Sequence, residues 1–80
     1  MPRFYIDFRN GNEIAKDIVG VDLPGLEEAK AAAVGSGREI LAENVKHASP
    51  NPLTEVIISD QSGTPLAAIA AKDILPEPLK

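Results

Sequence analysis

The stretch Arg-Phe-Tyr-Ile-Asp-Phe-Arg at residues 3–9 decides the fold class. Apolar and polar side chains alternate along it with a period of two, which is typical of a strand with one covered and one solvent-facing side. The covered side would carry Phe4, Ile6 and Phe8. The other side would carry Tyr5, Asp7 and Arg9. Because all the aromatic residues of the chain lie in this stretch, we expect it to anchor the core.

A second strand is predicted after a turn. Asn10-Gly11 tolerates positive φ and indicates the turn, whereas residues 12–16 fit no clear pattern. Residues 17–23 alternate again, although Gly20 interrupts them and indicates a bulge or a close backbone approach. The apolar residues that would share one face are Val19, Val21 and Leu23. The two strands would form an antiparallel hairpin with a loose connection.

A helix is predicted from Leu26 to about His47. Pro24-Gly25 ends the preceding strand, and Ser-Pro-Asn-Pro at residues 49–52 cannot continue a helix. One side of the helix would be apolar and face the sheet, with Leu26, Ala29, Ala33, Gly37, Ile40, Leu41 and Ala48. On the same helical wheel Gly37 lies at the centre of the apolar side, and Gly35 points to solvent.

Two further strands complete the predicted fold. Thr54 to Asp60 is rich in β-branched residues, and residues 60–64 form a turn. Leu66 to Ala71 is predicted as a strand because of that turn, although its alanines favour a helix. Residues 73–80 are predicted to be a loose tail. The chain is thus expected to be a single domain, residues 1–80, of the α+β class in the order β-β-α-β-β. Its small antiparallel sheet would have one helix packed on one face.

Composition limits the classes of function. The 80 residues carry a net charge of −4, and an acidic surface repels phosphate backbones, so we expect no nucleic-acid partner. Without cysteine there is neither a disulfide framework nor a thiolate. No apolar run approaches the ~20 residues that span a bilayer, and charges near the N-terminus leave no signal peptide. We therefore expect a soluble, cytoplasmic protein that contacts no membrane.

No residue pattern predicts catalysis or metal binding. His47 is the single histidine and is predicted at the C-terminus of the helix, where the helix dipole favours an imidazolium. Four carboxylates of the first hairpin could approach one another but lack the spacing of a calcium loop: Asp7, Glu13, Asp17 and Asp22. Gly35-Ser36-Gly37 lies inside a helical pattern, whereas a phosphate-binding loop follows a strand and opens a helix. We therefore expect no enzyme, no cofactor and no metal.

Short motifs recur at the ends of the predicted elements. The chain opens with Met-Pro-Arg-Phe-Tyr-Ile-Asp-Phe-Arg-Asn-Gly and continues with Asp-x-x-Gly at 17–20, Leu-Pro at 23–24, Leu-Glu-x-Ala at 26–29 and a second Asp-x-x-Gly at 60–63. In these motifs the chain resembles a family of small uncharacterised bacterial proteins, a domain of unknown function. It departs from the family at Gly25, where members have an aspartate N-cap, and at Gly35 and Gly37, where they have small helix formers. The resemblance implies a fold and no activity.

A second resemblance concerns residues 22–29. Asp-Leu-Pro-Gly at 22–25, followed by Glu-Glu-Ala at 27–29, is similar to the antitoxin partner of a bacterial mRNA-interferase pair. In those antitoxins several residues separate Leu-Pro-Gly from the helix, whereas here Leu26 follows Gly25 directly. This resemblance implies an antitoxin-like component as an alternative function.

The face of the sheet opposite the helix is the candidate interaction surface. It would carry Tyr5, Asp7 and Arg9, joined by Ile57 or Ile69. Because residues 56–58 are consecutive apolar residues, at least one must leave the helix side, and an exposed apolar side chain beside Tyr5 favours association. We expect a small non-catalytic interaction module that binds a protein partner or a second copy through the open sheet face or a strand edge. The remaining alternative is a small enzyme that uses carboxylates together with Arg3 or Arg9.

Overall fold

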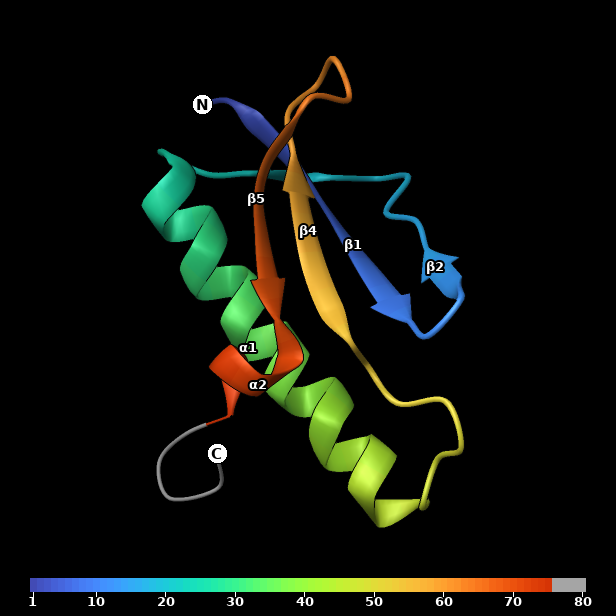
Figure 1. The fold of residues 1–80 in the computed structure, drawn as a ribbon. Helices are drawn as coiled ribbons and strands as arrows, with labels where there is room; N and C mark the ends of the chain where they lie inside the picture. The colour runs from blue at the N-terminus through green and yellow to red at the C-terminus, as the bar shows by residue number, and fades with distance from the viewer. Residues whose placement is uncertain (76–80) are drawn as a thin grey trace.

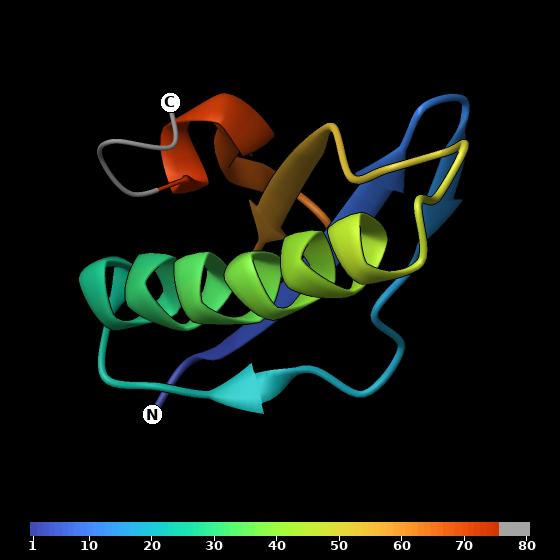
Figure 2. The ribbon, with the colours of Figure 1, turned by 90° about the horizontal axis from the view of Figure 1, so that it is seen from below.

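The computed structural model describes residues 1–75 of the chain. The elements follow one another as β1 (Arg3–Asn10), β2 (Glu13–Ala15), β3 (Val21–Asp22), α1 (Leu26–Lys46), β4 (Glu55–Ser59), β5 (Pro65–Ala70) and α2 (Ala71–Ile74). The strands form one antiparallel sheet, and α1 lies across one of its faces (Figures 1 and 2). This arrangement confirms the α+β class, the antiparallel sheet and the helix on one side.

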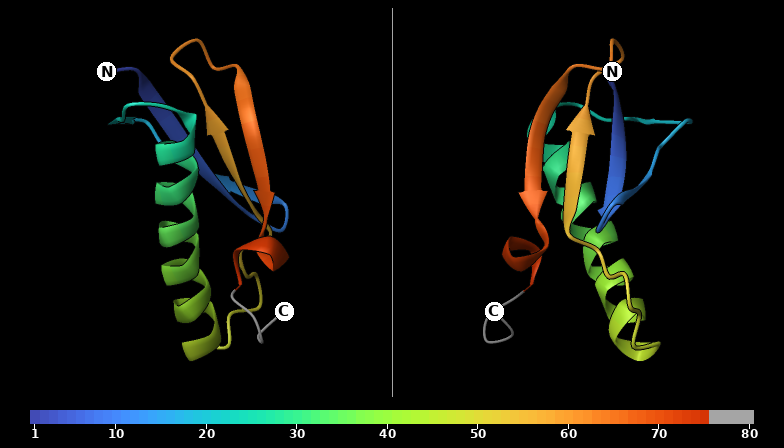
Figure 3. Two further views of the ribbon diagram at one scale, coloured as in Figure 1. Left: turned by 90° about the vertical axis from the view of Figure 1, so that its left-hand side faces the viewer. Right: turned by 45° about the vertical axis from the view of Figure 1, so that its right-hand side comes forward.

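The strand order is β2-β1-β4-β5, with β3 also paired to β1. β2 pairs with the second half of β1, where Phe8 lies opposite Ala15, and β3 pairs with its first half, where Phe4 lies opposite Val21. The two short strands therefore lie on the same side of β1. Figure 3 shows β5 at the opposite side of the sheet.

The core lies between α1 and the sheet, as the alternation in residues 3–9 predicts. Phe4 and Ile6 are buried, and Phe8 is half-buried against the same cluster. The other buried apolar residues are Ala29, Ala33, Leu53, Val56, Ile58 and Ile74. Since α1 presents alanine and glycine to the sheet, its backbone approaches the strands closely.

The two helix glycines have the opposite environments that the helical wheel predicts. Gly37 is buried, and a Cβ added there would come within 2.8 Å of Ile74 Cδ1. Gly35 is exposed, and a Cβ there would meet nothing within 4 Å. The helix is continuous through both residues, from Leu26 to Lys46.

The prediction of one strand over residues 17–23 is wrong. The chain pairs with β1 at residues 13–15 and again at 21–22, and residues 16–20 form a loop between the two. Gly20 adopts φ +79°, a left-handed conformation that breaks the extended path. As a result Val19 is exposed instead of sharing a covered face.

The prediction of a loose tail from Asp73 onward does not hold for residues 73–75. α2 turns the chain from the end of β5 towards α1, and the side chain of Ile74 is fully buried against Gly37 and its neighbours. Arg38 Nε donates a hydrogen bond of 2.9 Å to the Ile74 carbonyl, which ties α2 to α1. The rest of the predicted tail, residues 76–80, lies outside the described residues.

Neither helix of residues 1–75 has both the length and the apolar character that crossing a membrane would require.

Candidate interaction surface

The face of the sheet opposite α1 is here called the open face, and its side chains form three rows across the strands. The rows follow from the register: Arg9–Glu55–Ala70, Asp7–Ile57–Ala68 and Tyr5–Ser59–Pro65. In the part of the chain that the structure describes, no helix lies over this face (Figure 3). The open face is therefore a surface on which another molecule could pack.

Three of the four predicted surface residues are partly accessible on this face. Tyr5, Arg9 and Ile57 are half-buried, and Ile57 is the outward residue of the run 56–58, since Ile69 points to the core. Arg9 Nε lies 2.9 Å from Glu55 Oε1. This Nε has no hydrogen-bond partner, so we regard the contact as an ion pair without hydrogen-bond alignment.

Asp7, the fourth predicted residue, belongs to the open face by register but is 7% exposed. Its Oδ1 accepts a hydrogen bond of 2.8 Å from the Asp17 backbone N–H. Its Oδ2 lies 3.7 Å from Lys16 Nζ, on a side chain that is 72% exposed. Asp7 therefore holds the loop of residues 16–20 against the sheet, and Lys16 is the accessible group at that point.

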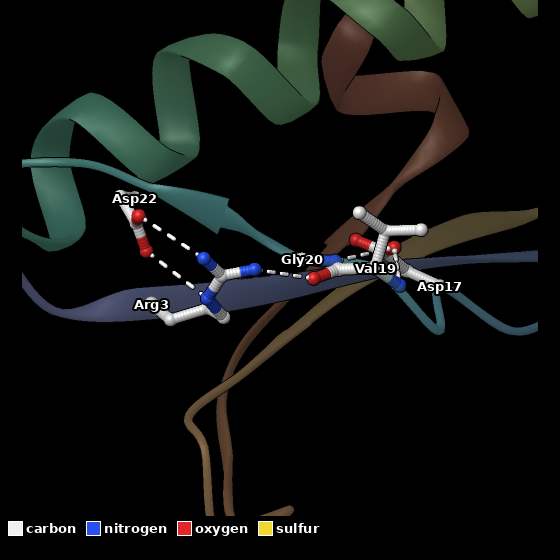
Figure 4. A network of polar contacts seen from close by, with 5 residues as sticks. All are labelled: Arg3, Asp17, Val19, Gly20 and Asp22. Atoms are coloured by element: carbon white, nitrogen blue, oxygen red, sulfur yellow. Dashed lines mark hydrogen bonds and ion pairs between the residues drawn. The ribbon is translucent and has the colours of Figure 1, made fainter.

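Asp17 fills the gap in the sheet between β2 and β3. Its Oδ2 accepts the Ile6 N–H at 3.1 Å, a backbone donor that a strand would otherwise have bonded. Its Oδ1 accepts the N–H groups of Val19 and Gly20 at 3.0 and 2.9 Å (Figure 4). One carboxylate thus replaces a missing piece of strand along β1.

Arg3 completes this network at the other end of the loop (Figure 4). It donates to the Val19 carbonyl at 2.7 Å, and its Nη2 and Nε lie 3.1 Å from the two carboxylate oxygens of Asp22. The planar guanidinium suits this two-point contact with a carboxylate. Arg3 therefore links the loop to β3.

Electrostatics keep Asp17 ionised. Burial by itself would raise the pKa of Asp17, but the N–H groups of Gly20, Ile6 and Val19, together with the Arg3 charge, hold that pKa below its ordinary value. The pKa of Asp60, in the turn between β4 and β5, is lowered by the Ser62 hydroxyl and the Thr64 N–H. Both carboxylates act as caps of loops.

The other two carboxylates of the predicted hairpin, Asp22 and Glu13, also have side-chain partners, and His47 lies on a different element. Asp22 pairs with Arg3, and Glu13 Oε1 accepts a long hydrogen bond of 3.4 Å from Asn51. His47 Nε2 lies 3.0 Å from Glu43 Oε2 on the exposed end of α1. Within residues 1–75, no three such side chains come together to hold a metal ion.

Two depressions flank β1. One, of about 240 Å³, lies on the open face among Tyr5, Asp7, Lys16 and Ser59. The other, of about 390 Å³, lies on the helix side, where Ile6, Phe8 and Ala32 form an apolar floor beneath the 16–20 loop. The carboxylates that line the first depression, Asp7, Asp17 and Asp60, each accept backbone N–H groups.

The role of Asp17 was not evident from the sequence. The motif Asp-x-x-Gly occurs at 17–20 and again at 60–63, and in both places the aspartate accepts backbone N–H groups of the loop that it opens. That shared spacing could have indicated loop caps in place of a strand at residues 17–23.

Comparisons with known proteins give a family and no activity. A search of the curated proteins and a search of the solved structures both found no match. One family model, Domain of unknown function (DUF6894), matches residues 3–72, which span β1 to the first half of α2. The chain therefore belongs to this family of uncharacterised domains.

Proposed function

We propose that this domain is a non-catalytic interaction module that binds another protein through its open face. The observation that carries the proposal is the composition of that uncovered face. Ile57 and Ala68 lie at its centre, and the charges beside them are paired as Arg9–Glu55 and Asp7–Lys16. An apolar centre with a polar rim is the usual anatomy of a protein interface.

The charge of the chain supports a protein partner. The net charge of −4 opposes binding to a phosphate backbone, whereas the paired charges of the open face leave it close to neutral. Asp7 and Asp17, which line a depression together with Tyr5, accept hydrogen bonds from backbone N–H groups. This supports a structural role for both carboxylates and argues against an acid–base site. We propose that the module acts in the cytoplasm.

Variants of two aliphatic surface residues test the proposal. Ile57→Thr keeps a β-branched residue in β4 but removes apolar surface from the open face, and Val45→Thr removes an aliphatic residue that is 82% exposed on α1. Proteins that co-purify with the parent chain from its native host would be identified, purified and titrated against the three chains. We expect Ile57→Thr to weaken binding by roughly tenfold or more and Val45→Thr to leave it unchanged.

Circular dichroism would show that both variants fold like the parent. Equal affinities for the parent and Ile57→Thr would contradict a contact through the open face.

A further inference from the structure

The outer side of β5 carries backbone groups that point away from the sheet. Ala71 N–H donates to the Thr54 carbonyl at 2.8 Å, in the same register in which Ile69 lies opposite Val56. Since the hydrogen-bonding direction alternates along a strand, Ile69 and Ala67 also turn their N–H and C=O groups towards β4. The N–H and C=O groups of Ala68 therefore point outward.

No element in the described residues pairs with this side of β5, which we call the open edge. Figure 3 shows α2 beyond the end of the strand and the outer side of β5 clear along its length. Pro65, at the start of β5, is the sole residue of the strand that lacks an N–H. An unpaired strand edge of this kind is a template for adding another strand.

The residues of the open edge carry no charge. From Thr64 to Ala71 the sequence reads Thr-Pro-Leu-Ala-Ala-Ile-Ala-Ala, in a chain whose net charge is −4. Two copies of the chain repel each other in general, but at this edge no charged side chain opposes contact.

From these features we propose that β5 pairs with β5 of a second copy, antiparallel, about a twofold axis at Ala68. The proposal goes beyond the interaction module proposed above, because it gives the chain a second contact surface, the open edge, whose partner is a second copy of the chain. An antiparallel strand pair is self-complementary, because the N–H of Ala68 in each copy meets the C=O of Ala68 in the other.

The ends of β5 place the axis at Ala68. Leu66 is the extra residue of a β-bulge, since Pro65 lies opposite Ser59 and Ala67 opposite Ile58. Ala70 is the N-cap of α2, so the strand turns away after it. Ala68 is the outward residue between these two irregularities. The joined sheet would bring Leu66, 40% exposed, and the centre of each open face towards the shared axis.

The mass of the chain in solution tests the pairing. We expect the parent chain to sediment as a dimer at micromolar concentration. In Ala68→Lys two ammonium groups would face each other at the axis, which should raise the dissociation constant about 100-fold or more. The matched control is Ala15→Lys, the same substitution at an exposed alanine of β2, at the opposite edge of the sheet. This variant should remain dimeric.

A disulfide between two copies of the chain would locate the twofold axis. The chain has no cysteine, so Ala68→Cys introduces the sole thiol. Opposite residues in a hydrogen-bonded antiparallel pair have Cα atoms ~5.5 Å apart, within the ~4.4–6.8 Å that a disulfide spans. Under mild oxidation Ala68→Cys should form a covalent dimer much faster than Ala15→Cys.

Each alternative outcome overturns the pairing in a recognisable way. A parent chain that is monomeric at every concentration tested removes the second copy as the partner. If Ala68→Lys is still dimeric, the two copies make contact through another surface. The same follows if Ala68→Cys forms the disulfide-linked dimer no faster than Ala15→Cys. None of these results decides the interaction-module proposal, whose own test is the loss of binding to a purified partner in Ile57→Thr.

Discussion

The two edges of this sheet end in different ways. Along β1, the short strands β2 and β3 and the Asp17 carboxylate together occupy the outward backbone groups, and Arg3, Asp22 and Lys16 add charge beside them. We call this side the protected edge. Along β5, the open edge, the described residues leave the outward groups of Ala68 unpaired, and no side chain from Thr64 to Ala71 is charged.

The two edges therefore serve different properties of the chain: the protected edge serves the stability of the fold, and the open edge serves association. Natural sheets use charges, short strands and covering loops to prevent edge-to-edge pairing, and the protected edge has all three. A domain that applies these features to one edge and not to the other keeps one edge available for a contact. Substitutions at the protected edge should therefore change the folding of the single chain, and substitutions at the open edge should change its assembly.

The largest effect is expected for Asp17→Ala at the protected edge. The substitution removes the acceptor of three backbone N–H groups and leaves the Ile6 amide without its partner, so the free energy of unfolding should fall by ~2–4 kcal/mol. Urea melts would measure it. Asp60→Ala, at the turn that leads into β5, is the control and should cost less because the Ser62 and Thr64 N–H groups that Asp60 accepts lie in a solvent-exposed turn. Equal losses would remove the distinction between the two loops.

The loop glycines provide the next comparison. Gly20 and Gly63 both have positive φ, +79° and +87°, which costs an alanine ~1–2 kcal/mol. At Gly20 the added Cβ would also come within 3.0 Å of Arg3 and Tyr5, whereas at Gly63 it would meet nothing within 4 Å. Gly20→Ala should therefore destabilise the chain by ~2–3 kcal/mol and Gly63→Ala by about 1 kcal/mol in thermal or urea melts. The reverse order would show that the protected edge is loosely packed.

Acid should weaken the protected edge through Asp17. Because the pKa of Asp17 is lower in the folded chain than its ordinary value of 3.8, its contribution to stability is complete above about pH 5. That contribution should be lost as the pH falls below about 4 and through the lowered pKa. Melts of the parent and Asp17→Asn between pH 7 and pH 2 should converge towards low pH. A constant difference between them would show that the Asp17 charge has no part in the effect.

The smallest effect on the single chain is expected at the open edge. Ala68 is exposed, so Ala68→Lys should change the free energy of unfolding by no more than ~0.5 kcal/mol at concentrations where both chains are monomeric. At higher concentration the melting temperature of the parent should rise with concentration while that of the variant stays constant, because dimerisation stabilises only the paired chain. A variant that is already destabilised in the dilute limit would mean that the open edge contributes to the fold itself.

Some elements could be predicted because their signal is local. The alternation of residues 3–9 predicts β1 and its buried face, and the spacing of small residues predicts the buried side of α1. The strand at 65–70 forms despite its alanines, because the turn at Asp60 returns the chain beside β4. In contrast, residues 17–23 alternate like a strand, but the Asp17 cap and the left-handed conformation of Gly20 prevent one.

The candidate surface was predictable in part. Alternation along β1 alone places Tyr5, Asp7 and Arg9 on one face, since side chains alternate along a strand whatever its neighbours are. Alternation within one strand does not show that Asp7 would be buried beneath Lys16 and the 16–20 loop. Nor does it show that Ile57 rather than Ile69 would face outward, which the pairing of β4 with β1 and β5 decides. Those outcomes depend on contacts between segments that lie far apart in the chain.

The sequence by itself determined the α+β class, the limits of α1, the inward face of β1 and the contrast between Gly35 and Gly37. Each depends on periodicity or turn chemistry within a few residues, which the local backbone enforces. The tertiary structure alone decided that β5 is the open edge, that Asp17 completes the other edge and that Ile74 enters the core above Gly37. Strand order and loop capping depend on the total free energy of contacts between segments that lie far apart in the chain, and a local sequence pattern carries no information about those contacts.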